Sequence, residues 1–369
     1  MKFKINKTHL DEIFEIVSRY SDSINTNYSF RCVLINVDNQ KITFTATNGI
    51  LSIVKSIQVD NVNVKVEEIG SFLIQSNYFK NIIKKLSGEI LIEKDDNDSS
   101  ILIMAGNSKY TLTTSDISTF PVIDKIYSPK KIEINTDEFK KAIKSVSFAT
   151  SQDNSLIYKC INFKFKKNSI NLAATDTYRL AHYSIKQKTN IDEEFDISVN
   201  GKDVKELIPN DAPKNVTLFY NNIKFGIEYK DTTITSRIVE LPYNDVEALF
   251  DVLDIKHKIT IKKDILSDIL NKVWIGNSDK NNKIEINVTK EFFKITNMLE
   301  EIGSFIAKTS DFELEGKSLD FDVNYNFIKD ALSVYDDDIY ILIDSDIKRI
   351  LILSKSNNNT KQLITPMRR

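Results

Sequence analysis

Asp176 and Arg179 lie close together in the segment 173–181 (Ala-Ala-Thr-Asp-Thr-Tyr-Arg-Leu-Ala), which follows a strand-like run at residues 169–172. A carboxylate beside a guanidinium at the end of a strand could bind or polarise a substrate, so this segment is the first candidate for chemistry. A weaker copy of it occurs earlier in the chain at residues 45–48 (Thr-Ala-Thr-Asn). The copy favours a repeated structural turn over a catalytic one.

The other residue types that perform chemistry do not form the patterns that catalysis requires. His9, His182 and His257 are scattered, none has a partner at metal-ligand spacing, and each is expected on the surface or half-buried. The sequence contains no glycine-rich phosphate loop and no GxSxG elbow. The acidic runs at 67–68, 192–194 and 336–338 are typical of solvated loops. We therefore expect a protein that is not an enzyme and that uses no metal or cofactor.

Length and composition indicate a globular protein of several domains. The chain has 369 residues, of which 41% are hydrophobic and 28% charged, and its net charge is only -2. Bulk charge therefore predicts no partner. Cys32 and Cys160 have no CxxC neighbour, which indicates buried, reduced thiols. No apolar run approaches the length of a membrane span or a signal peptide, so we expect a cytoplasmic protein with no membrane partner.

An internal repeat organises the chain. Each copy begins with period-two alternation, which predicts a short strand, and continues with apolar residues at helical spacing. The apolar positions are Phe3, Ile5, Leu10, Ile13, Phe14 and Val17, then Ile132, Ile134, Phe139, Ala142, Ile143 and Val146, then Ile259, Ile261, Leu266, Ile269, Leu270 and Val273. The sequence therefore predicts three tandem copies.

A second strand-helix unit follows the first in each copy. Its apolar positions are Phe72, Ile74, Phe79, Ile82 and Ile83, then Ile197, Val199, Val204, Leu207 and Ile208, then Phe321, Val323, Ile328, Ala331 and Leu332. Further strands are expected at 33–37, 42–46, 101–104, 110–113, 161–165, 216–220, 284–288 and 339–343, separated by turns such as 95–98. The predicted fold class is α+β, with three tandem copies of a doubled strand-helix domain.

Domain joins are expected where one copy ends and the next strand begins. The first join contains Phe120-Pro121 and the second contains the equivalent Leu241-Pro242. The predicted domains are residues 1–126, 127–254 and 255–369. The third copy ends at residues 363–369, where the other copies have their last strand, so we expect the C-terminus to be ordered.

Lysines recur on or beside the predicted helices, away from their apolar stripes. They include Lys80, Lys84, Lys140, Lys141, Lys144, Lys202, Lys205 and Lys263. A solvated helix face explains any one of them. Recurrence over the repeats suggests the alternative, a positive lining that holds a polyanion such as DNA. The first helix fits poorly because it carries Asp11, Glu12 and Glu15.

Three motifs occur in order, each in its own repeat: Gly106-x-Ser108-Lys109-Tyr110-x-Leu112-x-Thr114, Ala-Thr-Asp-x-x-Arg-Leu-Ala at 174–181, and Pro-Met-Arg at 366–368. With the threefold repeat, they make the whole chain resemble the bacterial sliding clamp, the beta subunit of DNA polymerase III. The resemblance implies a processivity factor, a head-to-tail homodimeric ring with helices lining the hole and sheets outside. It also implies double-stranded DNA, held without sequence specificity, as a partner. The replicative polymerase, the clamp loader and repair proteins are further implied partners.

The resemblance also implies a pocket for short peptides of these partners. Its residues would be Tyr158, Thr175, Thr177, Tyr178, Arg179, Leu180, Pro242, Val246, Leu363, Ile364, Thr365, Pro366, Met367 and Arg368. Ordinary strand packing is the alternative for Tyr178 and Leu180, and a core plug is the alternative for Met367. The family often has Gly at Thr177, His at Tyr178, a smaller aliphatic residue at Tyr158, Arg near Val246 and an apolar residue at Arg369. A narrower, less cationic pocket is therefore expected.

For ring closure, the resemblance places Tyr110 and Leu112 of the first domain against Trp274 and Ile275 of the third domain. Aromatic anchors suit such an interface, although a single Trp could equally belong to the core. An alternative to the ring is a repeat scaffold that binds protein peptides without encircling DNA.

Overall fold

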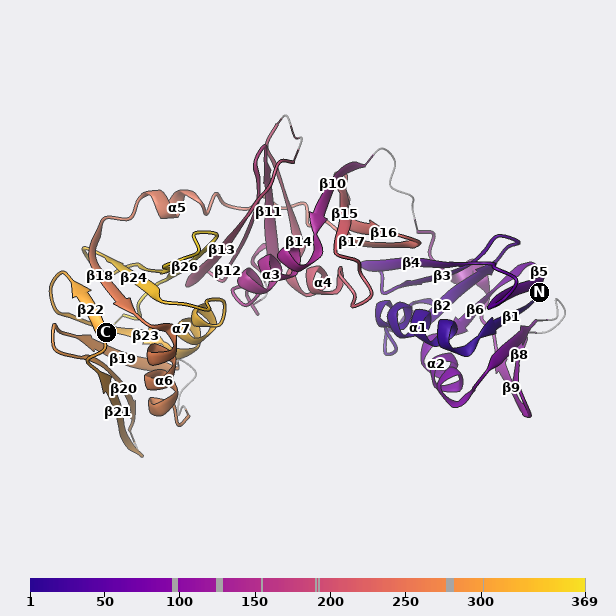
Figure 1. Cartoon of the computed structure of the whole chain (residues 1–369), viewed down its shortest axis with the longest axis horizontal. Helices are drawn as coiled ribbons and strands as arrows, with labels where there is room; N and C mark the ends of the chain where they lie inside the picture. The colour runs from indigo at the N-terminus through magenta and orange to yellow at the C-terminus, as the bar shows by residue number, and fades with distance from the viewer. Residues whose placement is uncertain are drawn as a thin grey trace. The chain divides into compact units, whose positions relative to one another are not determined.

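The computed structural model describes residues 1–94, 99–123, 129–153, 155–189, 191, 193–276, 282–300 and 302–368. It separates into two compact units. Unit 1 contains Met1–Thr136 and Lys202–Ile238, and unit 2 contains Asp137–Gly201 and Val239–Arg369. Figure 1 labels their helices and strands. The predicted turn at 95–98 and the predicted boundary between residues 126 and 127 lie outside the described residues, and the domain boundaries remain predictions.

Unit 1 contains a five-stranded antiparallel sheet in the order β5-β1-β7-β8-β9. Its strands are β1 (Lys2–Asn6), β5 (Val64–Glu68), β7 (Glu89–Glu93), β8 (Ser100–Ala105) and β9 (Ser108–Thr113). The acidic run at 67–68 belongs to β5, so the expectation of a loop there was wrong. Both carboxylates are exposed, which is why the strand pattern was hidden.

The second sheet of unit 1 has eight strands, in the order β10-β15-β16-β17-β4-β3-β2-β6. These are β2 (Cys32–Val37), β3 (Lys41–Thr47), β4 (Leu51–Gln58), β6 (Gly70–Gln75), β10 (Lys130–Asn135), β15 (Asn215–Tyr220), β16 (Lys224–Tyr229) and β17 (Thr232–Arg237). β4 and β17 pair from Leu51 opposite Ser236 to Lys55 opposite Thr232. This pairing joins strands of the predicted first and second domains into one sheet.

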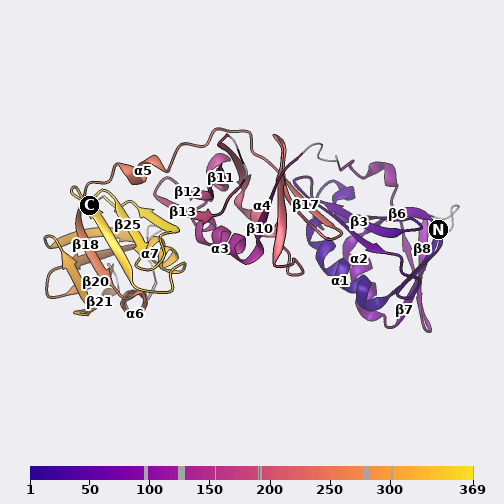
Figure 2. The same ribbon diagram turned by 45° about the horizontal axis from the view of Figure 1, so that its top comes forward.

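Two helices, α1 (Lys7–Val17) and α2 (Ser76–Lys85), pack side by side in unit 1, as Figures 1 and 2 show. The predicted apolar stripe of α1 faces the core, since Leu10, Ile13, Phe14 and Val17 are all buried. The Phe14 ring meets the Phe79 ring of α2 edge-on, with 4.9 Å between centroids. The helix α4 (Gly201–Glu206) crosses the boundary between the units along the chain, because Gly201 is assigned to unit 2 and the residues from Lys202 onward to unit 1.

Unit 2 contains a nine-stranded antiparallel sheet, in the order β14-β11-β12-β13-β26-β25-β24-β18-β22. Its strands are β11 (Cys160–Lys166), β12 (Ser169–Thr175), β13 (Arg179–Lys186), β14 (Phe195–Asn200), β18 (Ile255–Ile261), β22 (Phe312–Glu315), β24 (Ile339–Asp344), β25 (Ile350–Ser354) and β26 (Thr360–Ile364). β13 and β26 join the predicted second and third domains, as β4 and β17 join the first and second. The ordered C-terminal strand β26 confirms the expectation for residues 363–364.

The remaining sheet of unit 2 has four strands, in the order β21-β20-β19-β23. They are β19 (Lys283–Val288), β20 (Phe293–Leu299), β21 (Gly303–Thr309) and β23 (Leu319–Asn324), and the helices are α3 (Thr136–Ser147), α5 (Ala248–Asp251), α6 (Lys263–Val273) and α7 (Tyr325–Leu332). Short 3-10 turns occupy Ser18–Tyr20, Tyr28–Arg31, Ile117–Thr119 and Ile157–Lys159. The predicted apolar positions of the third copy all belong to one buried core.

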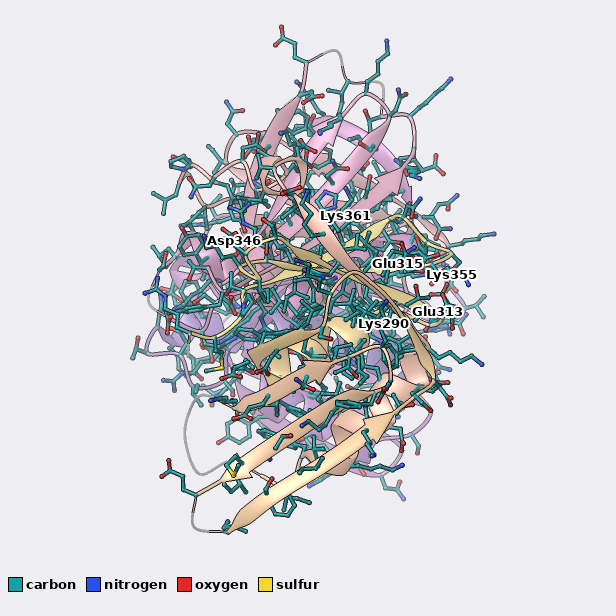
Figure 3. All side chains as sticks on the ribbon, turned by 90° about the vertical axis from the view of Figure 1, so that its left-hand side faces the viewer. Lys290, Glu313, Glu315, Asp346, Lys355 and Lys361 are labelled. Atoms are coloured by element: carbon teal, nitrogen blue, oxygen red, sulfur yellow. The ribbon has the colours of Figure 1, made fainter. Side chains whose placement is uncertain are left out.

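The eight further strands expected from the sequence are all present, in β2, β3, β8, β9, β11, β15, β19 and β24. Cys32 and Cys160 are buried thiols outside any disulfide, as predicted. Figure 3 shows charged side chains of both signs on the face of unit 2 that is turned to the viewer, among them Lys290, Glu313, Glu315 and Lys355. No helix among the described residues is long and apolar enough to cross a membrane.

Candidate functional site

The turn between β12 and β13 is built by its own side chains. Thr175 Oγ1 donates a hydrogen bond to the Arg179 carbonyl (2.6 Å) and accepts one from the Thr177 amide (3.1 Å). Asp176 Oδ1 accepts from the amides of Tyr178 (3.1 Å) and Arg179 (3.0 Å). Thr177 has φ of 78°, in the left-handed region. The Asp176 carboxylate therefore shapes the backbone.

The earlier copy of this segment forms the same turn between β3 and β4. Thr47 Oγ1 donates to the Leu51 carbonyl (2.7 Å) and accepts from the Gly49 amide (3.0 Å). Asn48 Oδ1 accepts from the amides of Ile50 (2.9 Å) and Leu51 (2.8 Å). Gly49 takes the left-handed position, with φ of 94°. The prediction of a repeated structural turn is confirmed.

The Arg179 side chain is only 13% exposed, and its charge is matched by partners from several elements of unit 2. Its Nε donates to Asp176 Oδ2 (2.9 Å), its Nη1 to Asp330 Oδ2 on α7 (2.6 Å) and its Nη2 to the Phe148 carbonyl after α3 (2.6 Å). The guanidinium carbon also lies 4.6 Å from the centre of the Phe327 ring. Arg179 therefore fastens the turn to the helical side of unit 2.

The C-terminal strand completes the site beside this turn. Leu180 of β13 lies opposite Leu363 of β26. Beyond the strand, the Thr365 amide and hydroxyl both donate to the Tyr178 carbonyl, at 2.9 and 2.8 Å. The Tyr178 side chain remains 62% exposed. Residues that are far apart in the sequence are thus held together by backbone hydrogen bonds.

A small apolar cluster lies on this part of the sheet. Ala173, Leu180, Val246, Leu351 and Leu363 are buried in it, and Tyr243, Phe250, Leu253, Leu342 and Leu353 pack around them. The structure thus brings together three of the predicted pocket residues, Leu180, Val246 and Leu363. Residues 243–253 of the segment that leads to β18 supply part of its cover.

The other predicted pocket residues lie around the cluster with different exposure. Tyr158 is half-buried, and Tyr243, whose phenol pKa is raised by burial, lies near both Tyr158 and the Thr175 backbone. Ile364 is buried, Pro366 and Met367 are half-buried, and Pro242 and Arg368 are exposed. The Met367 amide donates to the Asp322 carbonyl (2.8 Å), which fixes the tail.

Sequence reasoning missed Glu247, which fastens the segment 243–250 to the sheet. Its Oε2 pairs with Lys166 Nζ at 2.6 Å, and its Oε1 accepts from Asn171 Nδ2 at 2.6 Å and lies 3.3 Å from His182 Nε2. These contacts, led by the one with His182, hold the pKa of Glu247 well below its usual range. His182 is only 7% exposed, so the expectation of a surface or half-buried histidine was wrong.

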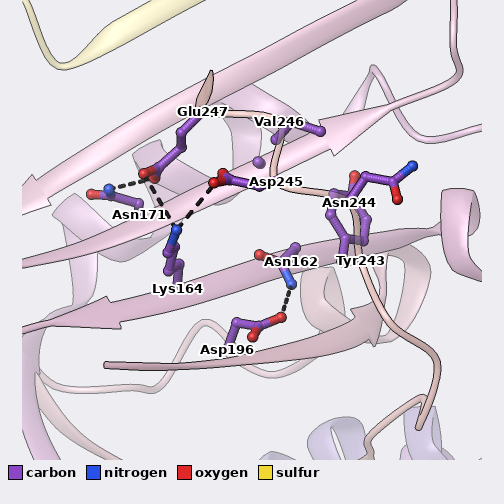
Figure 4. Close-up of a pocket in the computed structure, with 10 residues that line it drawn as sticks. Asn162, Lys164, Asn171, Asp196, Tyr243, Asn244, Asp245, Val246 and Glu247 are labelled. Atoms are coloured by element: carbon purple, nitrogen blue, oxygen red, sulfur yellow. Dashed lines mark hydrogen bonds and ion pairs between the residues drawn. The ribbon is translucent and has the colours of Figure 1, made fainter. Parts of the chain in front are cut away.

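A cavity of about 130 Å³ lies beside Glu247 (Figure 4). It is lined by Asn162, Lys164, Asn171, Ala173, Asp196, Tyr243, Asn244, Asp245, Val246 and Glu247. Lys164 Nζ lies between Asp245 (3.7 Å) and Glu247 (3.9 Å). The cavity shares Ala173 and Val246 with the apolar cluster. No spacing in the sequence could have predicted it, because its residues come from three strands and an irregular segment.

The predicted DNA-facing lysines differ in their surroundings. Lys80 and Lys84 of α2 both pair with Glu15 of α1. Lys140, Lys141 and Lys144 are exposed along α3, and Lys202 and Lys205 are exposed on α4. Lys263 is half-buried at the first residue of α6. The described residues include no cluster of His, Cys, Asp and Glu that could hold a metal ion.

The predicted interface residues lie on an end strand of a sheet in unit 1 and at the end of a helix in unit 2. Tyr110 and Leu112 are half-buried on β9, the end strand of the five-stranded sheet. Trp274 is half-buried at the end of α6 and stacks on Tyr325, with 4.0 Å between ring centroids. Ile275, which follows it, is 63% exposed.

Tandem domains of paired strand-helix units, joined by sheets that continue from one domain to the next, define a clamp-type architecture. Residues 1–124 match the DNA polymerase III beta subunit N-terminal domain, residues 133–245 its central domain and residues 253–368 its C-terminal domain. The beta sliding clamp of Mycoplasmopsis pulmonis is 31% identical over 376 residues, which cover 100% of both chains. The chain therefore belongs to the bacterial beta sliding clamp family, and it is a DNA sliding clamp, a processivity factor of replication.

Other relatives agree. The beta sliding clamp of Bacillus subtilis is 25% identical over 377 residues, covering 100% of each chain. The crystal structure of the DNA polymerase sliding clamp from Bacillus subtilis matches 100% of this chain and 99% of its own, with a TM-score of 0.94. The beta chain structure from Streptococcus pneumoniae has the same fold, with a TM-score of 0.93 at 22% identity and full coverage of both chains.

Proposed function

We propose that two copies of the chain close head to tail into a ring around duplex DNA and tether the replicative polymerase there. The clamp loader and repair proteins are further proposed partners, in the cytoplasm. The protein tethers other proteins and catalyses no reaction. The observation that carries this proposal is the pattern of strand pairing at the joins within the chain.

Strands that occupy the same position in the repeat as β9 and β21 pair with each other in the eight-stranded and the nine-stranded sheets. β17 corresponds to β9 and β4 corresponds to β21, and they pair with each other in unit 1. The same pairing recurs as β26 with β13 in unit 2. β9 and β21 themselves are end strands. Because unpaired edge strands favour further pairing, β9 of one copy and β21 of a second copy would complete the series.

The equivalence also predicts the register of this pairing. Ile234 of β17 lies opposite Ile53 of β4, and Gln362 of β26 lies opposite Ala181 of β13. The hairpin registers make Tyr110 equivalent to Ile234, and Phe305 equivalent to Ile53. Tyr110 of one copy is therefore expected opposite Phe305 of the other. Exposed Ile275 and Ile306 would be covered by the same contact.

The turn 175–180, the residues Tyr158, Pro242 and Val246, and the tail 363–368 form the proposed partner-peptide pocket. Support comes from the apolar cluster of Leu180, Val246 and Leu363, and from the exposed Tyr178 side chain of the adjoining turn. An apolar cleft beside backbone that is already fixed can anchor a short peptide. The lysines of α2, α3, α4 and α6 are proposed to face DNA through contacts that carry no sequence information.

Retention on circular DNA tests the ring. Protein loaded by the organism's clamp loader should remain on nicked circular DNA during gel filtration and be lost after the circle is linearised. A protein that is monomeric at micromolar concentration by light scattering and is not retained on circles would overturn the proposal. Tyr110→Lys should give monomers, because it places a charge opposite Phe305.

A substitution in the tail tests the pocket separately. Met367→Ala should weaken binding to the immobilised replicative polymerase, because Met367 belongs to the tail whose Thr365 bonds to the turn. The dimer should stay intact, because Met367 is not on β9 or β21. Unchanged affinity for the polymerase would remove Met367 from the pocket.

A further inference from the structure

Glu15 of α1 is held between two lysines of α2. Its Oε2 lies 2.8 Å from Lys80 Nζ and its Oε1 lies 2.7 Å from Lys84 Nζ, so each carboxylate oxygen has its own ammonium partner. Lys80 Nζ also donates to Ser18 Oγ at 3.0 Å. The acidic residue that did not fit a basic lining is therefore attached to that lining's own lysines.

The core of unit 1 fixes this arrangement. Glu15 follows Phe14, and Lys80 follows Phe79, and the two rings pack with 4.9 Å between centroids. Lys80 and Lys84 are four residues apart and therefore share one face of α2. The contact between the rings sets the spacing of the helices, and the carboxylate then lies within reach of both ammonium groups.

The contacts favour the charged forms of Glu15 and Lys84. Hydrogen bonds from Lys80 and then Lys84 lower the pKa of Glu15 to about 2, and Glu15 raises the pKa of Lys84. The two lysines thus present one net positive charge where the sequence alone suggests two. On α3, by contrast, Lys140, Lys141 and Lys144 are exposed, and no ion pair between described residues involves them.

We propose that Glu15 is a built-in counter-anion that competes with DNA phosphates for Lys80 and Lys84. This inference rests on the proposed function, in which these lysines face DNA. Before a phosphate can bind either lysine, it must displace a carboxylate that is already in place. The contribution of α2 to DNA affinity is therefore small, and the lysines of α3 supply more of the salt-dependent attraction. Weak contact of this kind suits a protein that slides.

The salt dependence of DNA binding measures the number of lysines that reach phosphate. Each such contact with duplex DNA steepens the slope of log K against log salt by about 0.9. Glu15→Gln keeps the shape of the side chain but removes its charge, so Lys80 and Lys84 become available. The slope should steepen by about 1 to 2, and affinity at low salt should rise several-fold.

The experiment is fluorescence anisotropy of a labelled linear duplex with the full-length protein, over a series of salt concentrations. Glu12→Gln is the matched control, because it makes the same change in net charge at an exposed position of α1. Lys80 and Lys84 pair with Glu15 and not with Glu12. The gain of Glu15→Gln should exceed that of Glu12→Gln, and should vanish when Lys80→Ala and Lys84→Ala are added. Equal slopes for the two Gln variants would overturn the counter-anion.

A third variant separates this result from a failure of the proposed function. Lys140→Ala, Lys141→Ala and Lys144→Ala together should reduce DNA affinity if helix lysines face DNA at all. No loss in this variant would overturn the proposed DNA-facing surface. A loss in this variant together with equal slopes for Glu15→Gln and Glu12→Gln would overturn the counter-anion alone.

Discussion

The turns at 47–51 and 175–179 share one pattern of hydrogen bonds but are attached to different parts of the protein. Both are closed by a threonine hydroxyl and by an Asn or Asp side chain through the same four hydrogen bonds. They differ in their last residue, because Leu51 is buried as an apolar residue where Arg179 makes ion pairs. The local polar residues therefore define the turn, and its last side chain decides which part of the protein the turn is attached to.

The strands that flank the two turns extend the comparison. β4 pairs with β17 and β13 pairs with β26, but only β26 is followed by a tail that hydrogen bonds to the turn. The linkers differ as well, since Phe120 is buried beside Cys32 and Leu73, whereas the equivalent Leu241 is exposed. In unit 2 it is Val246 and Phe250, a few residues later, that pack on the sheet. The two repeats thus differ in their linkers and tails, and in unit 2 the linker and the tail contribute to the proposed docking surface.

Arg179→Leu gives the second turn the residue of the first and should have the largest effect. The change removes three hydrogen bonds and leaves Asp330 and the Phe148 carbonyl without the guanidinium. We expect a loss of about 2 to 3 kcal/mol in the free energy of unfolding, measured by urea denaturation. The dimer should persist. An unchanged unfolding midpoint would show that the ion pairs of Arg179 contribute nothing.

Glu247→Gln tests the linker side of the comparison. The pKa of Glu247 is depressed in the folded protein, so its stabilising contribution is complete above its ordinary pKa of 4.5 and is lost as the pH falls below that value. The variant should be less stable by about 1 to 2 kcal/mol at pH 7, and the difference should shrink toward pH 3. Polymerase affinity should fall too, because Glu247 holds the neighbouring Val246 in the apolar cluster.

Asp211→Asn is the matched control in unit 1. Asp211 pairs with Lys55 at 2.7 Å and accepts from the Tyr229 hydroxyl at 2.8 Å, so it fastens a loop to the other join. Its loss should reduce stability and leave polymerase affinity unchanged. Equal affinity losses in the two variants would mean that Glu247 acts on the whole fold and not on the proposed docking surface.

The repeats could be predicted from the sequence because apolar spacing is a local signal. Leu10, Ile13, Phe14 and Val17 specify a helix face whatever the rest of the chain does. The pairing of β17 with β4 could not be predicted, because the residue pattern at 232–236 is that of any strand and does not specify the neighbouring strand. The contacts of Glu247 and Glu15 were hidden for the same reason, since each depends on side chains that are distant in sequence.

Thr177→Gly makes the second turn more like the first and should have the smallest effect, in the opposite direction. A β-branched residue at φ of 78° is strained, whereas Gly adopts this conformation freely but gains entropy in the unfolded chain. We expect a net gain of about 1 kcal/mol in urea denaturation. Gly49→Ala should destabilise by a similar amount or more, since an added Cβ would lie 3.1 Å from the Phe30 ring. If Thr177→Gly were destabilising, the Thr177 side chain would have to make a contact worth more than its backbone strain. The two turns would then differ in their backbone energetics as well as in their attachments.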